Sequence, residues 1–170
     1  MNKGMNNGMN MDGGIHEIPM PMLPGQLWLC GKHFIGPDPE VAVRRVNADH
    51  VVCLVQEHEL RGRYDDYIRW LRPNERATWF PIHDLSSPVL SDVLPLYQQV
   101  KERLARGESI VAHCAAGIGR AGTLAIAVCQ LAGMPLDEAL THVRHHRPGA
   151  GPEAGSQLDV VVALDKLLSR

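Results

Sequence analysis

The stretch "VAHCAAGIGRAGTLA", from Val111 to Ala125, decides the fold of this chain. A strand-like apolar run ends in His-Cys, a loop with two glycines follows, and Arg120 then begins an apolar run with helical spacing. The order strand, loop, helix predicts one unit of an α/β fold, with the chemistry located in the loop.

The rest of the chain repeats this alternation. Four apolar runs predict strands at residues 26–30, 50–55, 77–82 and 109–113. Helical patterns cover residues 38–46, part of 59–72, 91–107, 120–133, 136–147 and 156–169, with Asp38 and Ser91 as expected N-caps. We expect one α/β domain with a central, mostly parallel sheet of four to five strands, flanked by helices on both faces.

Length and composition set the domain organisation. The 170 residues suit one domain, with residues 1–14 as a flexible N-terminal tail and 15–170 as the folded unit. A net charge of -2 without a long basic run argues against nucleic-acid binding. The longest uncharged run after the loop, residues 121–136, is too short to span a membrane. Four scattered cysteines favour a reducing, cytoplasmic location, and we favour a monomer.

Each part of the loop has a physical role. Gly117 and Gly119 let backbone N–H groups turn inward as an anion nest, and the helix that follows adds its positive end. The guanidinium of Arg120 can bind two phosphate oxygens together. The same positive surroundings favour the thiolate of Cys114, which is the nucleophilic form. The residues therefore predict a phosphate held over a reactive sulfur.

This segment carries a family resemblance. "HCAAGIGRAGT", residues 113–123, resembles the phosphate loop of the cysteine-dependent protein tyrosine phosphatases, and the short chain resembles their small dual-specificity branch. Residues 23–32 and 147–157 resemble other segments of that branch, and Arg147 and Pro148 match a pair that we interpret as structural. The resemblance implies that Cys114 is the nucleophile, that Arg120 binds phosphate and that His113 supports the thiolate. The implied phosphate cradle consists of Ala115, Ala116, Gly117, Ile118, Gly119 and Arg120.

Two further roles follow from the resemblance. Asp84 in "FPIHDLSSP" lies 30 residues before Cys114, close to the family's spacing for the general acid, and turn-forming residues follow it. Asp92 is the competing carboxylate, although it better fits the first turn of the next helix. Gln157 matches a glutamine that positions the attacking water in relatives, and an ordinary polar residue at a helix start is an equal alternative.

Ala121 departs from the family pattern. Relatives usually carry Ser or Thr at this position, and its hydroxyl donates to the cysteine sulfur. Thr123 is two residues further along the helix, so we expect its hydroxyl to face away from the sulfur. The resemblance therefore predicts a cycle that closes slowly at its second step.

Weaker patterns concern metals and oxidation. His142, His145 and His146 lie near one another and suggest a metal site, with His142 and His146 one turn apart. No third ligand for this pair is evident, and cationic residues suit a helix C-terminus, so we expect no metal and no cofactor. Cys53 could form a disulfide with Cys114, as neighbouring strand cysteines do in some relatives, but a packed core thiol is favoured. Glu57 is interpreted as a solvated charge or a cap.

The sequence thus favours a metal-independent phosphatase that acts on a phosphorylated protein or peptide, with preference for phosphotyrosine over phosphoserine and phosphothreonine. A phosphoinositide or RNA-phosphate phosphatase is the second interpretation, but Ala115, Ala116 and Ile118 stand where relatives with highly charged substrates place lysines. A phosphoprotein-binding module that has lost turnover is the third, and the intact Cys114, Arg120 and Asp84 argue against it.

Overall fold

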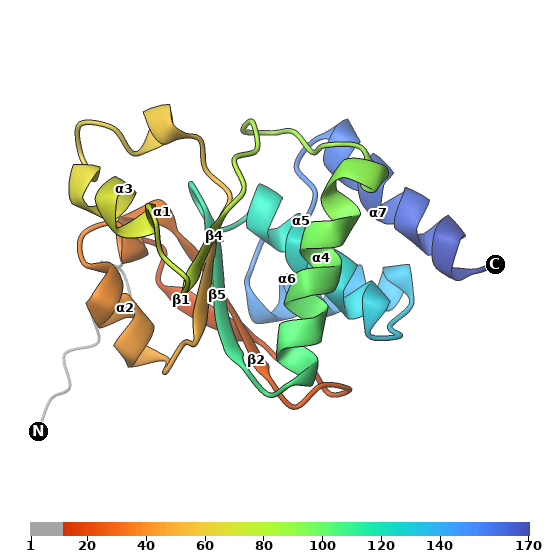
Figure 1. Cartoon of the computed structure of the whole chain (residues 1–170). Helices are drawn as coiled ribbons and strands as arrows, with labels where there is room; N and C mark the ends of the chain where they lie inside the picture. The colour runs from red at the N-terminus through yellow and green to blue at the C-terminus, as the bar shows by residue number, and fades with distance from the viewer. Residues whose placement is uncertain (1–11) are drawn as a thin grey trace, which may run out of the picture.

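One five-stranded sheet forms the centre of the molecule, with strand order β1-β2-β5-β3-β4 (Figure 1). The computed structural model describes residues 12–170. Strands β2, β5, β3 and β4 run parallel, and β1 pairs antiparallel with β2 at one edge. The strand bounds are β1 Ile15–Ile18, β2 Gln26–Gly31, β3 His50–Cys53, β4 Ala77–Trp79 and β5 Ser109–Cys114. The predicted fold class is confirmed.

Helices cover both faces of this sheet. Three short helices lie on one face and four longer ones on the other (Figure 1). The first group is α1 Lys32–Ile35, α2 Pro39–Arg45 and α3 Asp65–Leu71, with the 3-10 turn η1 Glu57–Glu59 before α3. The second group is α4 Leu90–Ala105, α5 Gly119–Leu131, α6 Leu136–His146 and α7 Gly155–Leu168. Within residues 12–170, no helix is long and apolar enough to cross a membrane.

Strand β5 and helix α5 form the core on which the site is built. All six residues of β5 are buried, and so is every residue of α5 from Gly119 to Gln130. A helix that is apolar on all sides must be enclosed, and α4, α6 and α7 enclose α5. A side chain at Gly122 would collide with the backbone N of Gly151, so this glycine lets the segment before α7 approach the start of α5.

Three details differ from the sequence expectations. Helix α4 begins at Leu90 with Val89 as its N-cap, so the expected Ser91 cap is wrong; Val89 follows Pro88 and holds an extended backbone. The strand expected at residues 77–82 ends at Trp79, ahead of Pro81, which has no N–H for the ladder. Strand β1 and helix α1 were not predicted, because four-residue elements carry little periodicity.

The expected start of helix α2 is confirmed. Asp38 caps α2 by accepting from the N–H of Val41 at 3.2 Å, and Pro39 is the first helical residue.

Residues 1–14 are expected to be a flexible tail. Residues 1–11 of this segment lie outside the described part of the chain, so its flexibility stays a prediction. The carboxyl end of β5 lies between those of β2 and β3, where open α/β sheets usually bind their ligands.

Candidate active site

The loop between β5 and α5 has its carbonyl oxygens hydrogen-bonded away from the site. The carbonyl of Ala115 accepts from the backbone N–H of Lys32 at 2.9 Å, and that of Ile118 accepts from the N–H of Gly151 at 3.0 Å. The two carbonyls between them are both bound by Arg147. Because peptide units are planar, fixing these oxygens outward holds the N–H groups of the loop inward.

Arg147 is a buried support beneath the loop and is only 2% exposed. Its Nε donates to the carbonyl of Gly117 at 2.8 Å and its Nη2 to that of Ala116 at 2.9 Å. Its Nη1 lies 2.7 Å from Nδ1 of His16 on β1 and donates to the carbonyl of Leu29 on β2 at 3.2 Å. One side chain therefore joins the loop to two strands, in agreement with the structural interpretation of Arg147.

The inward N–H groups form an anion nest. Those of Ala116, Gly117 and Ile118 donate to no atom of residues 12–170. Gly117 has a φ of 73°, and a Cβ there would collide with the carbonyl of Cys30, so only glycine fits this turn. The N-terminus of α5 follows directly and adds its positive end, so the loop is shaped and polarised for a phosphate group.

Cys114 ends β5 and lies within this loop. Its sulfur is 3.5 Å from the backbone N of Ala121, and the residue is 2% exposed. The hydroxyl of Thr123 donates to the carbonyl of Gly119 at 2.7 Å, which confirms that it faces away from the sulfur. Within residues 12–170 no side-chain hydroxyl hydrogen-bonds this sulfur, and its one donor there is the backbone N–H of Ala121.

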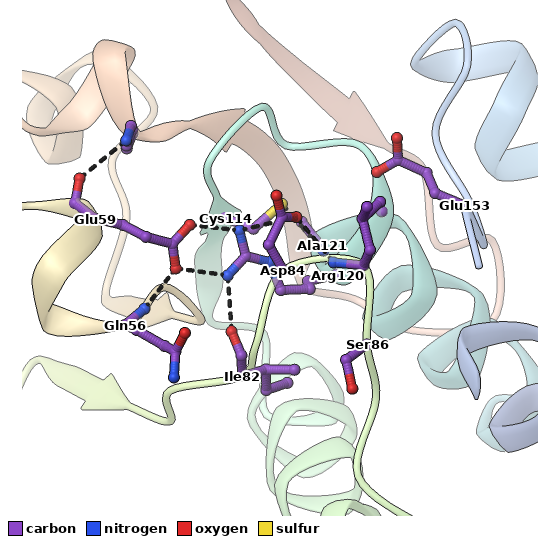
Figure 2. A network of polar contacts seen from close by, with 12 residues as sticks. Gln56, Glu59, Ile82, Asp84, Ser86, Cys114, Arg120, Ala121 and Glu153 are labelled. Carbon is purple, nitrogen blue, oxygen red and sulfur yellow. Dashed lines mark hydrogen bonds and ion pairs between the residues drawn. The ribbon is translucent and has the colours of Figure 1, made fainter. Parts of the chain in front are cut away.

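Arg120 is held in place by one carboxylate and one carbonyl. Its Nη1 donates to Oε2 of Glu59 at 2.8 Å and to the carbonyl of Ile82 at 2.7 Å, and its Nη2 donates to Oε1 of Glu59 at 2.8 Å (Figure 2). Asp84 Oδ1 lies 3.4 Å from Nη2, and the buried Nε has no partner among the described residues. The edge formed by Nε and Nη2 is therefore the one that can bind an oxyanion in the bidentate manner, with the anion displacing Asp84.

Glu59 was missed by the sequence analysis. Burial of Glu59 acts to raise its pKa, yet the hydrogen bonds from Arg120 and from the N–H of Gln56 hold that pKa below its usual value. Burial likewise opposes the charge on Arg120, but Glu59 and Cys114 raise the pKa of the guanidinium. Both side chains of this pair are therefore charged. Gln56 and Glu59 form a capping box, a local pattern that marks the start of η1 but does not identify Glu59 as the partner of Arg120.

The segment carrying Asp84 is attached to the start of α7. Gln157 is fully buried, and its Nε2 donates to the carbonyl of Ser86 at 3.3 Å. The N–H of Ser87 donates to Ser156 Oγ at 3.2 Å. Asp84 itself is 64% exposed at its side chain and lies beside Arg120 and Cys114 in Figure 2. The structure therefore brings Asp84, Arg120, Cys114 and Gln157 to one site, and it leaves Asp92 in the first turn of α4.

His113 contacts the nucleophile through the backbone. Its Nδ1 lies 3.1 Å from the carbonyl oxygen of Cys114 and its Nε2 lies 2.6 Å from the hydroxyl of Tyr67. Burial lowers the pKa of His113 to about 4, so the ring is neutral at pH 7. A neutral ring donates a hydrogen bond from Nδ1 to the carbonyl oxygen of Cys114 and accepts one at Nε2 from the hydroxyl of Tyr67. Its expected support of the thiolate would therefore act through the position of Cys114.

Cys53 is a packed core thiol. It is fully buried and stands opposite His113 in the sheet register. Burial raises the pKa of its thiol to about 12. Because successive side chains alternate across a strand, Cys53 shares the face of His113, whereas Cys114 is one position further along. This placement favours the core interpretation over a disulfide with Cys114.

The histidine group of α6 serves packing. The Nε2 of His142 donates to the carbonyl of Pro19 at 2.7 Å, and its ring meets that of His146 edge to face. Across residues 12–170, no cluster of three or more His, Cys, Asp or Glu side chains could hold a metal ion.

The chain is similar to known phosphatases in sequence and in fold. The family model "Tc-R-P: Polymorphic toxin system, DSP-PTPase phosphatase" matches residues 46–134, just over half of the chain. Among solved structures, Tk-PTP in its active form is 28% identical, with a TM-score of 0.69 over 89% of this chain and 97% of that one.

Two further structures share the fold at lower identity. PTPMT1 in complex with PI(5)P is 19% identical, with a TM-score of 0.71 over 91% of this chain and 96% of its own. Human DUSP28 is 15% identical, with a TM-score of 0.69 over 92% of this chain and 95% of its own. At these identities the likeness concerns the fold alone.

The ion pair of Glu59 and Arg120 predicts an asymmetric effect on stability. The two side chains are 11% and 1% exposed, whereas Glu57, which pairs with Arg72, is 38% exposed. Removing one partner of a buried pair leaves an uncompensated charge, so Glu59→Gln should lower the free energy of unfolding by about 3 to 5 kcal/mol. Glu57→Gln should change it by about 0.5 kcal/mol or less. Urea unfolding measures the change for each variant. Equal small changes would contradict the assignment of Glu59 as the buried partner of Arg120.

Proposed function

Because the chain belongs to the DSP-PTPase phosphatase family of polymorphic toxin systems and is a cysteine-dependent phosphatase, we propose that it hydrolyses phosphotyrosine in proteins through a phosphocysteine intermediate. One observation carries the proposal. The sulfur of Cys114 lies in a loop whose N–H groups face inward without partners, and the free Nε of Arg120 lies at the same site. An in-line attack by sulfur on a phosphoryl group fits this arrangement.

In the first step the thiolate of Cys114 forms a bond to phosphorus while the bond from phosphorus to the tyrosine oxygen breaks. The protonated carboxyl of Asp84 gives its proton to that oxygen, which leaves as a neutral phenol. The loop N–H groups and Arg120 neutralise the charge on the three equatorial oxygens. Asp84 can reach the leaving group because its carboxylate is exposed and already lies next to Arg120.

In the second step a water molecule attacks phosphorus and the bond from sulfur to phosphorus breaks. Asp84, now a carboxylate, takes a proton from this water, and the thiolate is restored as inorganic phosphate leaves. Gln157 is the candidate for orienting the water, because its amide reaches the segment that carries Asp84. The N–H of Ala121 is the donor left to stabilise the departing sulfur.

Substrate breadth follows from the loop surroundings. A chain of this length lacks the additional loops that would deepen the pocket, so we assign dual specificity with preference for phosphotyrosine. The loop residues Ala115, Ala116 and Ile118 bring no positive side chain to the substrate, which disfavours the phosphoinositide and RNA-phosphate alternatives. We also propose a reducing, cytoplasmic location, because all four cysteines are free.

Replacement of the nucleophile is the direct test. Cys114→Ser should abolish hydrolysis of para-nitrophenyl phosphate, because serine keeps the shape of the site but its hydroxyl is a much weaker nucleophile than a thiolate. Inorganic phosphate should still bind, and isothermal calorimetry with phosphate measures that. Hydrolysis by the serine variant at the wild-type rate would refute the cysteine mechanism, and inhibition of the wild type by chelators would indicate a metal-dependent reaction.

The two candidate acids can be separated by leaving-group chemistry. Asp84→Asn should lower kcat/KM on phenyl phosphate, which reports the first step, by about 10² to 10⁴, the usual contribution of general acid–base catalysis. The loss should shrink on substrates with acidic phenols, which leave without protonation. Asp92→Asn is the matched control and should stay near the wild type. If the leaving-group dependence instead follows Asp92→Asn, the assignment of the acid is wrong.

The alanine after the arginine predicts a slow second step. With only a backbone donor at the sulfur, the transition state of phosphocysteine hydrolysis should lose about 2 to 3 kcal/mol of stabilisation. This loss slows the second step by about 30- to 150-fold. Rapid-mixing experiments should show a burst of phenol near one per enzyme, with kcat independent of the leaving group. Ala121→Thr should raise kcat and reduce the burst. Absence of both effects would mean that the first step limits the rate.

A further inference from the structure

A carboxylate with no assigned role lies at the rim of the phosphate loop. Glu153 belongs to the segment before α7, and a Cβ added to Gly119 would collide with its Oε1. The same position lies 3.2 Å from Nε2 of Gln157. In Figure 2, Glu153 stands on the opposite side of Cys114 from Glu59, with its carboxylate directed toward the loop. An acidic group thus lies over the last residue of the anion nest.

The backbone fixes this position. The N–H of Glu153 donates to Oε1 of Gln157 at 2.7 Å, and Gln157 is fully buried. Two residues earlier, the N–H of Gly151 donates to the carbonyl of Ile118 in the loop itself. The segment that carries Glu153 is therefore attached to the phosphate loop on one side and to α7 on the other, so the carboxylate stays near the site.

Glu153 has no salt-bridge partner within residues 12–170. In the part of the chain that the structure describes, no salt bridge involves its carboxylate, whereas Glu59 is paired with Arg120 on the other side of the site. Three arginines lie close to the loop, but none is paired with Glu153. Arg120 binds Glu59, Arg147 binds the loop carbonyls, and Arg144 lines one surface pocket with Glu153 without a salt bridge to it. Glu153 therefore keeps an unpaired negative charge at the Gly119 end of the loop.

A free carboxylate beside a phosphate site has a definite consequence. It repels the dianionic phosphoryl group of every substrate, and the repulsion is compensated only when the substrate brings its own positive charge to the same place. A polyanionic substrate would add to the repulsion. We propose that Glu153 selects phosphorylated peptides or proteins with an arginine or lysine next to the phosphorylated residue. This inference rests on the proposed function and specifies its substrate class.

Paired peptides test the proposal. Two phosphotyrosine peptides differ only in the residue after the phosphotyrosine, which is arginine in one and citrulline, its neutral near-isostere, in the other. The wild type should prefer the arginine peptide by about tenfold in kcat/KM at low salt, and the preference should fall as salt is added. In Glu153→Gln the preference should drop below about twofold, chiefly through the KM of the arginine peptide.

Glu102→Gln is the matched control, because it removes an exposed carboxylate of α4 outside the site. It should keep the wild-type preference. The proposal also requires that Glu153→Gln lower the KM for para-nitrophenyl phosphate, which carries no positive charge. A wild type without arginine preference, or a preference that survives in Glu153→Gln, overturns the inference while cysteine-dependent turnover stands. Absence of any turnover that depends on Cys114 would instead overturn the proposed function.

Discussion

The orientation of four peptide units, those of residues 115–118, is the constraint on which the rest of this structure depends. Their N–H groups can face a phosphate only if their carbonyl oxygens face the protein, and each buried carbonyl needs a donor. The donors come from the start of α1, from Arg147 and from the segment before α7. Much of the fold around β5 can be understood as bringing these distant donors to one loop.

The charge at the site is balanced by a second layer of contacts. Arg120 is buried, and an unpaired buried charge would destabilise the fold. Glu59 compensates this charge and leaves Nε without a partner among the described residues. His113 is kept neutral by its burial, so it adds no further charge beneath the loop. Arg147 binds the loop from beneath, so the positive groups that face the substrate are the guanidinium of Arg120 and the backbone N–H groups.

The sequence predicted what is local and failed where distant residues meet. Cys114, Arg120 and the glycines lie within seven residues, so their joint role is visible in the chain. The contacts of Glu59 and Arg147 span 61 and 30 residues, and nothing in the sequence says which carboxylate or guanidinium reaches the loop. The expected Ser91 cap failed because the backbone after Pro88, rather than a side chain, determines where α4 begins.

Arg147 also has a consequence for the timing of synthesis. The nucleophile and its arginine leave the ribosome well before residue 147, and the loop cannot hold its shape until that side chain is threaded between the loop and strands β1 and β2. The last donor to the loop, the N–H of Gly151, follows four residues after Arg147. The loop can therefore take its final shape only after the chain has been made as far as Gly151, although Cys114 and Arg120 are made much earlier.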